Sequence, residues 1–135
     1  MRDGGDENRL KLKGRAIFEG RAEGEALVSS APLSFYGGVN PDTGEIVERG
    51  SELAGQSVKG KVLVFPYGKG STVGSYILYR LAKNGVAPSA IVNAKCETIV
   101  AVGAIISEIP CVDEVDVGKI KQGAMVRVDG ATLEF

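Results

Sequence analysis

The chain has 135 residues, of which 44% are hydrophobic and 24% are charged, and its formal net charge is -1. This length suits one domain with a single core, and a nearly neutral charge provides no field that would attract a nucleic acid or an acidic membrane surface. The sequence contains no histidine. It therefore cannot supply a Ser-His-Asp or Cys-His catalytic unit, a histidine metal ligand or a phosphohistidine.

Two cysteines, Cys96 and Cys111, stand apart in the sequence. Two thiols are too few for a thiolate-bound zinc or iron–sulfur site, and they do not form the pattern of a secreted disulfide scaffold. We therefore expect no metal on this chain and a cytoplasmic location. Residues 1–9 are polar and predict a flexible tail before a single domain over residues 10–135. The longest apolar run, Ile99 to Ile106, is too short to span a membrane.

The first half of the chain predicts strands separated by a long loop. Apolar and polar residues alternate from Leu10 to Phe18 with a break at Gly14, which predicts a half-buried strand with a possible bulge, and Glu25–Ser29 is the candidate partner strand. Residues 30–50 are rich in turn residues and predict a loop. The apolar run Lys61–Phe65 is typical of a central strand covered on both faces.

The next segment predicts a parallel βαβ unit. An apolar residue recurs at every fourth position from Val73, which predicts a helix that ends at Asn84-Gly85 and has Ser71 as its N-cap. An apolar strand follows at residues 90–92. Residues 61–93 thus contain two strands joined by a helix, the arrangement that makes neighbouring strands parallel.

The last third predicts one more helix and three short strands. Residues 97–108 are apolar nearly all round, which favours a buried helix. Cys111-Val112 is a candidate strand, and residues 125–129 and 131–135 predict a hairpin that turns at Asp129-Gly130. The sum is an α/β domain in which a central parallel βαβ unit is joined by antiparallel strands from both termini.

The segment from Gly68 to Thr72 is the main candidate binding site, because it lies between a buried strand and the start of a helix. Unpaired backbone N–H groups and the helix dipole favour an anion there. We therefore expect Gly68, Lys69, Gly70 and Thr72 to bind the carboxylate or phosphate of a small-molecule substrate. Neither a Walker P-loop nor a dinucleotide fingerprint has this spacing. The alternative is a strand-to-helix turn that needs glycine and a serine cap.

Ser71 is the candidate catalytic residue in this segment. A serine hydroxyl is a very weak acid, and without histidine the help available to it is electrostatic. Lys69, the neighbouring N–H groups and the helix dipole can stabilise its alkoxide, or the same groups can hold a substrate carboxylate beside it.

Two other segments are weaker candidates for binding. Gly37 and Gly38 follow two adjacent aromatic residues, and the alternative there is a hydrophobic anchor for a turn. Residues 93–97 follow a parallel strand and should open on the same edge of the sheet as Gly68. In that segment we expect Cys96 to be a small buried residue rather than a nucleophile, and Lys95 and Glu97 to be solvated.

Four segments of the chain together resemble one family. They are residues 35–44, 60–66, 68–75 and 84–88. They are similar to the small, swivelling subunits of the aconitase X group, over residues 14–112, and the block Gly-Lys-Gly-Ser-Thr-Val-Gly-Ser is the most specific part. The resemblance implies a swivelling β/β/α domain related to the mobile domain of aconitase. It also implies a larger partner subunit that carries the iron–sulfur cluster and most of the substrate site.

The resemblance further implies the activity of a two-subunit hydro-lyase whose small subunit is inactive alone. The reaction would be the dehydration of (R)-5-phosphomevalonate to trans-anhydromevalonate 5-phosphate, in the archaeal mevalonate route to isoprenoids. Ser71 matches the serine that accepts the proton in this group. Two alternatives stay open at this point: dehydration of cis-3-hydroxy-L-proline, which related enzymes catalyse, and a non-catalytic anion-binding or scaffold domain.

Overall fold

The computed structural model describes residues 10–135, so the tail predicted for residues 1–9 lies outside the described part. The described residues form short strands, two α-helices and one 3-10 turn. In chain order these are β1 (Lys11–Lys13), β2 (Arg15–Phe18), β3 (Arg21–Val28), β4 (Leu33–Ser34), β5 (Val62–Phe65), β6 (Gly68–Lys69), α2 (Val73–Lys83), β7 (Ala90–Asn93), α3 (Thr98–Ser107), β8 (Cys111–Asp113), η1 (Val117–Lys119), β9 (Met125–Asp129) and β10 (Thr132–Glu134).

Eight of the strands form one sheet in the order β1-β10-β9-β3-β5-β7-β8-β2. The two strands at its ends, β1 and β2, are separated in sequence by Gly14 alone, so the sheet must curve until its ends meet. At this seam the N–H of Gly14 donates to the carbonyl of Ala131 at 2.8 Å. A Cβ on Gly14 would overlap the carbonyl oxygen of Asp113, so the seam requires glycine.

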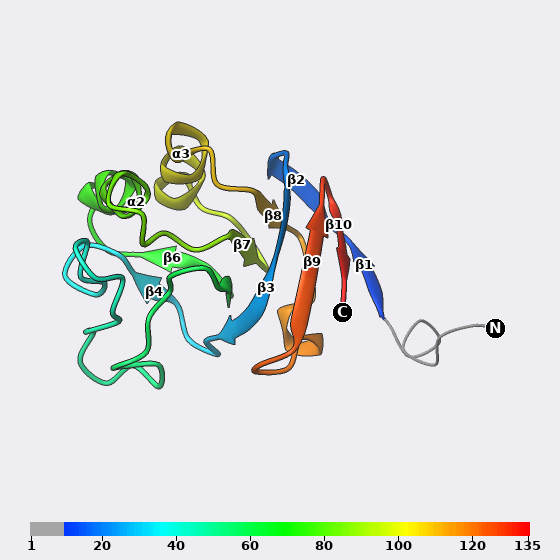
Figure 1. Ribbon diagram of the computed structural model, residues 1–135, viewed down its shortest axis with the longest axis horizontal. Coiled ribbons are helices and arrows are strands. Elements are labelled where there is room, and N and C mark those ends of the chain that lie inside the picture. The colour runs from blue at the N-terminus through cyan, green and yellow to red at the C-terminus, as the bar shows by residue number, and fades with distance from the viewer. Residues whose placement is uncertain (1–9) are drawn as a thin grey trace.

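The parallel strands β3, β5, β7 and β8 separate two hydrophobic cores, because successive side chains of a strand point to opposite faces. All four residues of β5 are buried. One core lies between these strands and a layer formed by the helices and the loop of residues 33–58, and its members include Phe35, Phe65, Leu63, Leu78, Leu81 and Ile91. The second core lies on the opposite side of these strands, inside the curved sheet, and includes Val62, Val64, Val92, Val112, Val126, Val128 and Leu133. Figure 1 shows α2 and α3 on one side of these strands and β9, β10 and β1 at the far end.

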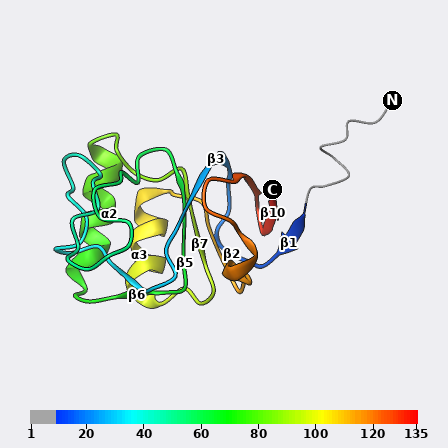
Figure 2. The same cartoon turned by 90° about the horizontal axis from the view of Figure 1, so that it is seen from below.

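The predicted parallel unit and the antiparallel strands from both termini are confirmed. β5 pairs in parallel with β7, and β1, β10 and β9 pair antiparallel. The helix α2 has Asn84 as its C-cap, followed by Gly85 at a φ of 72°, as the sequence predicts. Seen from below, α2 and α3 form a layer beside the sheet (Figure 2). Together these elements give the expected swivelling β/β/α arrangement.

Two predictions about pairing are wrong or incomplete. The segment Glu25–Ser29 does not pair with residues 10–18: it belongs to β3, which pairs with β9 and β5. Alternation identifies a strand but not its partner, and here the C-terminal hairpin lies between β1 and β3. The loop predicted for residues 30–50 contains β4, whose Leu33 pairs in parallel with Gly68 of β6.

The helices are less buried than the sequence predicts. Val73 at the start of α2 is 42% exposed, and the buried face of that helix is formed by Gly74, Ile77, Leu78 and Leu81. In α3, Val102, Ile105 and Ile106 are exposed, so this helix is not the fully buried one expected. Only its Val100, Gly103 and Ala104 face is buried. Across residues 10–135, no helix combines the length and apolar character that crossing a bilayer requires.

Candidate active site

The structure brings two of the predicted binding segments together. Ser34 of β4 pairs with Lys69 of β6, so the loop that carries Gly37 and Gly38 continues beside the Gly68–Thr72 segment. The approach is close, because a Cβ on Gly70 would lie 2.6 Å from Ser34 Oγ, and Gly70 has a φ of 94°. Glycine at this position satisfies both the left-handed backbone and the close contact.

Ser71 lies on the surface at the end of this segment, directly before α2. The helix begins at Val73 with Thr72 in the N-cap position, and the Thr72 side chain makes no capping hydrogen bond. The prediction that Ser71 is the N-cap is therefore wrong by one residue. Its hydroxyl still satisfies one backbone group of the first turn, because Ser71 Oγ accepts a hydrogen bond from the Val73 N–H at 3.2 Å. This bond fixes the position of the hydroxyl oxygen at the positive end of the helix dipole.

The backbone donors around Ser71 are only partly available to a ligand. The N–H groups of Gly74 and Ser75 donate to the carbonyls of Ser71 and Thr72, at 2.9 and 3.2 Å. The expectation of an unpaired first turn is wrong for these groups and for Val73. Within residues 10–135, the N–H groups of Ser71 and Thr72 have no acceptor. Two adjacent backbone donors on exposed residues are therefore available beside the Ser71 hydroxyl.

Lys69 has a partner that the sequence did not suggest. Its Nζ lies 3.0 Å from Oε2 of Glu48, with the Lys69 side chain 50% exposed and that of Glu48 21% exposed. The other carboxylate oxygen of Glu48 accepts a hydrogen bond from the Ser34 N–H at 3.2 Å. Glu48 thus connects the two loops. It lies in a loop without periodicity, so no sequence signal identifies it.

An open hollow of about 380 Å³ lies beside this ion pair. Its wall contains Lys69 together with residues 29–32 and 48–52. The charges of Lys69 and Arg49 are opposed there by those of Glu48 and Glu52. An anionic ligand that enters the hollow must compete with carboxylates that are already in place.

The third predicted segment, residues 93–97, lies on the expected edge of the sheet but has a different role. Asn93 Nδ2 donates to the carbonyl of Phe65 at 2.9 Å, inside the sheet. Glu97 is not solvated as expected, because its carboxylate accepts hydrogen bonds from the N–H groups of Ile99 and Val100, both at 2.9 Å, and caps α3. A Cβ on Gly68 would lie 2.6 Å from Oε1 of Glu97. The Glu97 carboxylate therefore packs closely against Gly68 of the candidate loop.

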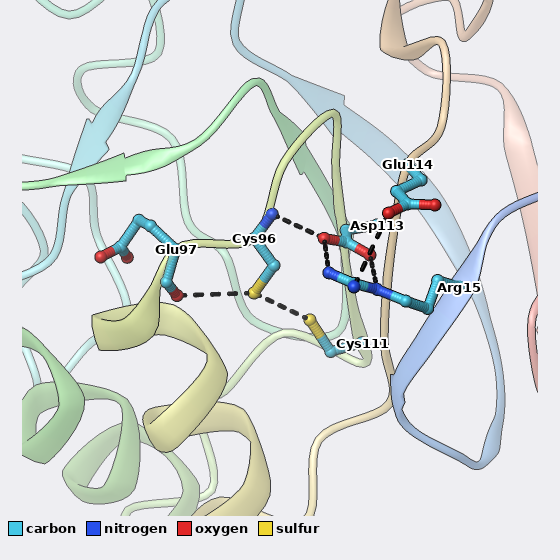
Figure 3. A network of polar contacts seen from close by, with 6 residues as sticks. All are labelled: Arg15, Cys96, Glu97, Cys111, Asp113 and Glu114. Atoms are coloured by element: carbon cyan, nitrogen blue, oxygen red, sulfur yellow. Dashed lines mark hydrogen bonds and ion pairs between the residues drawn. The ribbon is translucent and has the colours of Figure 1, made fainter.

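Cys96 is half-buried, and its Sγ lies 3.9 Å from that of the buried Cys111 (Figure 3). The backbone N–H of Cys96 donates to Asp113 Oδ2 at 2.9 Å, and both carboxylate oxygens of Asp113 accept hydrogen bonds from the Arg15 guanidinium. In the described part of the chain, no group of three or more His, Cys, Asp or Glu side chains is placed to hold a metal ion. Residues 10–135 therefore do not form a site that fits an iron–sulfur cluster.

Comparisons with known proteins agree with this fold. The phosphomevalonate dehydratase small subunit of Thermococcus kodakarensis is 62% identical over 125 residues, which cover 93% of this chain and 94% of that protein. The protein of the same name from Methanosarcina acetivorans is 59% identical, with 90% and 87% covered.

Two solved structures have the same fold. The crystal structure of Thermococcus kodakaraensis aconitase X in its holo-form matches with a TM-score of 0.91 and 59% identity, over 93% of this chain and 97% of that one. The solution NMR structure of a UPF0107 protein matches with a TM-score of 0.84 and 51% identity, over 92% and 97%. The family model described as aconitase X swivel domain matches residues 11–135. The chain therefore belongs to the aconitase X swivel domain family.

Proposed function

We propose that this chain is the small subunit of a phosphomevalonate dehydratase, a hydro-lyase that acts as a complex with a larger subunit. The support is that relatives at 59–62% identity, matched over most of their length, carry that name. The reaction removes a proton and a hydroxyl group from adjacent carbons of (R)-5-phosphomevalonate and gives trans-anhydromevalonate 5-phosphate and water. The names of these relatives do not favour the hydroxyproline alternative.

In this proposal Ser71 accepts the proton from the carbon next to the substrate carboxylate. The observation that carries the assignment is the exposed Ser71 hydroxyl, which is held by the Val73 N–H at 3.2 Å at the start of α2. A donor fixed on Oγ and the positive end of the helix both favour negative charge on that oxygen. A proton acceptor near neutral pH is needed, and a chain without histidine must use another group.

The groups around Ser71 would orient the anionic ends of the substrate. Lys69 supplies a positive charge, and the N–H groups of Ser71 and Thr72 supply donors that have no acceptor within residues 10–135. The close packing at Gly68 and Gly70, and the adjoining loop with Gly37 and Gly38, would shape the contact with the substrate. When the substrate binds, its carboxylate or phosphate would replace Glu48 as the partner of Lys69.

The larger subunit would complete the site. We assign the iron–sulfur cluster expected of this group to that partner, because the described residues of this chain do not form a site for one. We also assign the complex to the cytoplasm, in keeping with the two free thiols of this chain. The small subunit would contribute the proton acceptor and part of the anion contacts.

The test is the variant Ser71→Ala, assayed on (R)-5-phosphomevalonate in the complex with the large subunit. Loss of a general base typically lowers turnover by about 100-fold or more, and we expect kcat to fall by at least that factor. Subunit assembly and the iron content of the complex should stay as in the wild type. Turnover near the wild-type rate would refute the catalytic role and favour the scaffold alternative.

The matched control is Ser57→Ala. Ser57 Oγ accepts a hydrogen bond from the N–H two residues later at 3.2 Å, the same local bond that Ser71 makes with Val73. Loss of turnover in both variants would point to loop stability instead of proton transfer. Activity of the wild-type complex on cis-3-hydroxy-L-proline but not on phosphomevalonate would overturn the proposed substrate and leave the role of Ser71 open to the same comparison.

A further inference from the structure

Two free thiols face each other beneath the start of α3. Cys96 lies in the loop between β7 and α3, Cys111 lies in β8, and their sulfur atoms are 3.9 Å apart (Figure 3). Cys111 is fully buried, whereas Cys96 is half-buried. The pair therefore joins a fully buried cysteine to one that is partly exposed to solvent.

A polar network holds the two thiols in this arrangement. The Cys96 N–H donates to Asp113 Oδ2 at 2.9 Å, which ties the loop of Cys96 to the strand of Cys111. Asp113 is itself held by Arg15, whose Nε and Nη2 donate to its two carboxylate oxygens at 3.0 and 2.9 Å. The hydrogen bond with Cys96, together with burial, raises the pKa of Cys111 far above its usual range. Cys111 is thus a poor first target for an oxidant, and Cys96 is the better one.

We propose that Cys96 and Cys111 form an intramolecular disulfide when the protein meets hydrogen peroxide. In the first step the Cys96 sulfur attacks one oxygen of hydrogen peroxide and the O–O bond breaks. The leaving hydroxide takes the thiol proton, so the products are a sulfenic acid on Cys96 and water. In the second step the Cys111 sulfur attacks the Cys96 sulfur, the S–O bond breaks, and a second water leaves with the Cys111 proton. Two thiols and one hydrogen peroxide thus give one disulfide and two waters.

The bond would change how α3 is attached to the sheet. A disulfide holds its sulfurs about 2.05 Å apart, so the two sulfurs must approach by about 2 Å from their present 3.9 Å. The new link closes a covalent loop from Cys96 to Cys111 that contains all of α3. Such a loop restricts the unfolded chain, and the oxidised protein should be more resistant to heat. The inference does not depend on the proposed dehydratase function.

The experiment uses the purified full-length chain, reduced and then treated with hydrogen peroxide under native conditions. Remaining thiols are alkylated after denaturation, and the mass and the linked peptides are determined. We expect one disulfide per monomer between Cys96 and Cys111, no alkylation of either residue, and full reversal by a thiol reductant. Thermal unfolding should show a higher Tm for the oxidised protein that returns to the starting value on reduction.

Single variants separate the two steps. With Cys111→Ala, oxidation should stop at a sulfenic acid on Cys96 that dimedone traps; with Cys96→Ser, the buried Cys111 should stay a free thiol. Three results with the wild-type chain would overturn the proposal: both thiols remain free while peroxide is consumed elsewhere, Cys96 becomes a sulfinic acid with Cys111 still free, or the disulfides join two chains. A disulfide that forms only after unfolding would overturn it as well.

Discussion

The loop around Ser71 and the junction around Asp113 are both polar, but they differ in how much of their bonding capacity the protein uses itself. Asp113 is completely buried, and its two oxygens accept hydrogen bonds from Arg15 and the Cys96 backbone. Lys69 is half exposed and makes one ion pair, and the Ser71 hydroxyl lies open at the surface. A buried carboxylate with all its contacts made stabilises the fold, whereas exposed donors with few internal contacts are available for a ligand.

The largest effect on stability should come from Asp113→Asn. The amide would place an N–H₂ group among donors, so a buried hydrogen bond to Arg15 or to the Cys96 N–H would be lost and a polar group left unpaired. We expect the free energy of unfolding to fall by about 2–3 kcal/mol, toward the low end for a broken buried pair because Arg15 is half exposed. Urea unfolding at neutral pH measures the change.

The control for this variant is Asp129→Asn, which removes the same charge from an exposed pair. Asp129 lies 3.3 Å from Arg21, with the two side chains 61% and 85% exposed. We expect a change below about 0.5 kcal/mol. Equal losses of unfolding free energy in the two variants would show that burial does not make the contacts of Asp113 more stabilising.

Acid should remove the contribution of Asp113. Burial alone would raise the pKa of its carboxyl group, but hydrogen bonds from Arg15 and the Cys96 N–H, with the charges of Arg15 and Lys95, lower the pKa below its ordinary value. The unfolded chain, with an Asp pKa of about 3.9, then binds the proton more readily than the folded one. The stabilisation is complete above that pH and is lost as the pH falls through the folded pKa.

The wild type and Asp113→Asn should therefore converge in acid. Their urea midpoints should differ most near neutral pH and approach each other below about pH 4. A gap that stays constant down to the acid unfolding range would mean that the carboxylate does not contribute through its charge.

A smaller effect is expected at the two adjacent glycines of the loop beside Ser71. A Cβ on Gly38 would overlap the carbonyl oxygen of Ser34, which belongs to β4, so Gly38→Ala must displace backbone. We expect a loss of about 2 kcal/mol. Gly37 has open space around it but a φ of 80°, and Gly37→Ala should cost about 1 kcal/mol through backbone strain alone. Chemical unfolding of the two variants compares them, and an equal cost would argue against the close approach at Gly38.

Local sequence patterns predicted most elements of this fold because those elements depend on neighbours in sequence. The apolar run at residues 61–65, the glycine after α2 and the Asp129-Gly130 turn each carry their own signal. The partner of β3 carries none. That partner depends on the topology at Gly14, because this single residue separates β1 and β2, which lie at opposite ends of the sheet order.

The same distinction holds for the candidate site, where local patterns predict some residues and strand pairing brings in others. The Gly-Lys-Gly-Ser-Thr segment can be recognised from sequence, because glycines and a hydroxyl residue between a strand and a helix are typical of an anion-binding turn. Glu48 cannot be identified from sequence, because its carboxylate reaches Lys69 only through the pairing of β4 with β6. The Glu97 cap was missed because glutamate is not among the residues preferred at helix N-caps.

The smallest effects on stability, and the sharpest test of the open region, should come from Lys69→Met and Glu48→Gln. A half-exposed ion pair such as this one contributes about 1 kcal/mol or less, so both variants should unfold within about 1 kcal/mol of the wild type. Their KM values for phosphomevalonate in the assembled complex should move in opposite directions. In the proposed site, Lys69→Met removes the cation that would pair with the substrate anion and should raise KM, whereas Glu48→Gln removes the competing carboxylate and should lower it.

Each shift should be about 2- to 5-fold, which corresponds to the free energy of one half-exposed charge pair. A rise in KM for both variants would mean that Glu48 acts chiefly by positioning Lys69 through its second contact, the Ser34 N–H at 3.2 Å. The open loop would then resemble the Asp113 junction, with a carboxylate fixed between two segments as a structural link. A fall in KM for Glu48→Gln would mean that the Ser71 loop and the Asp113 junction differ in function. Removing the internal partner of Lys69 strengthens ligand binding only if the ligand exchanges with that partner.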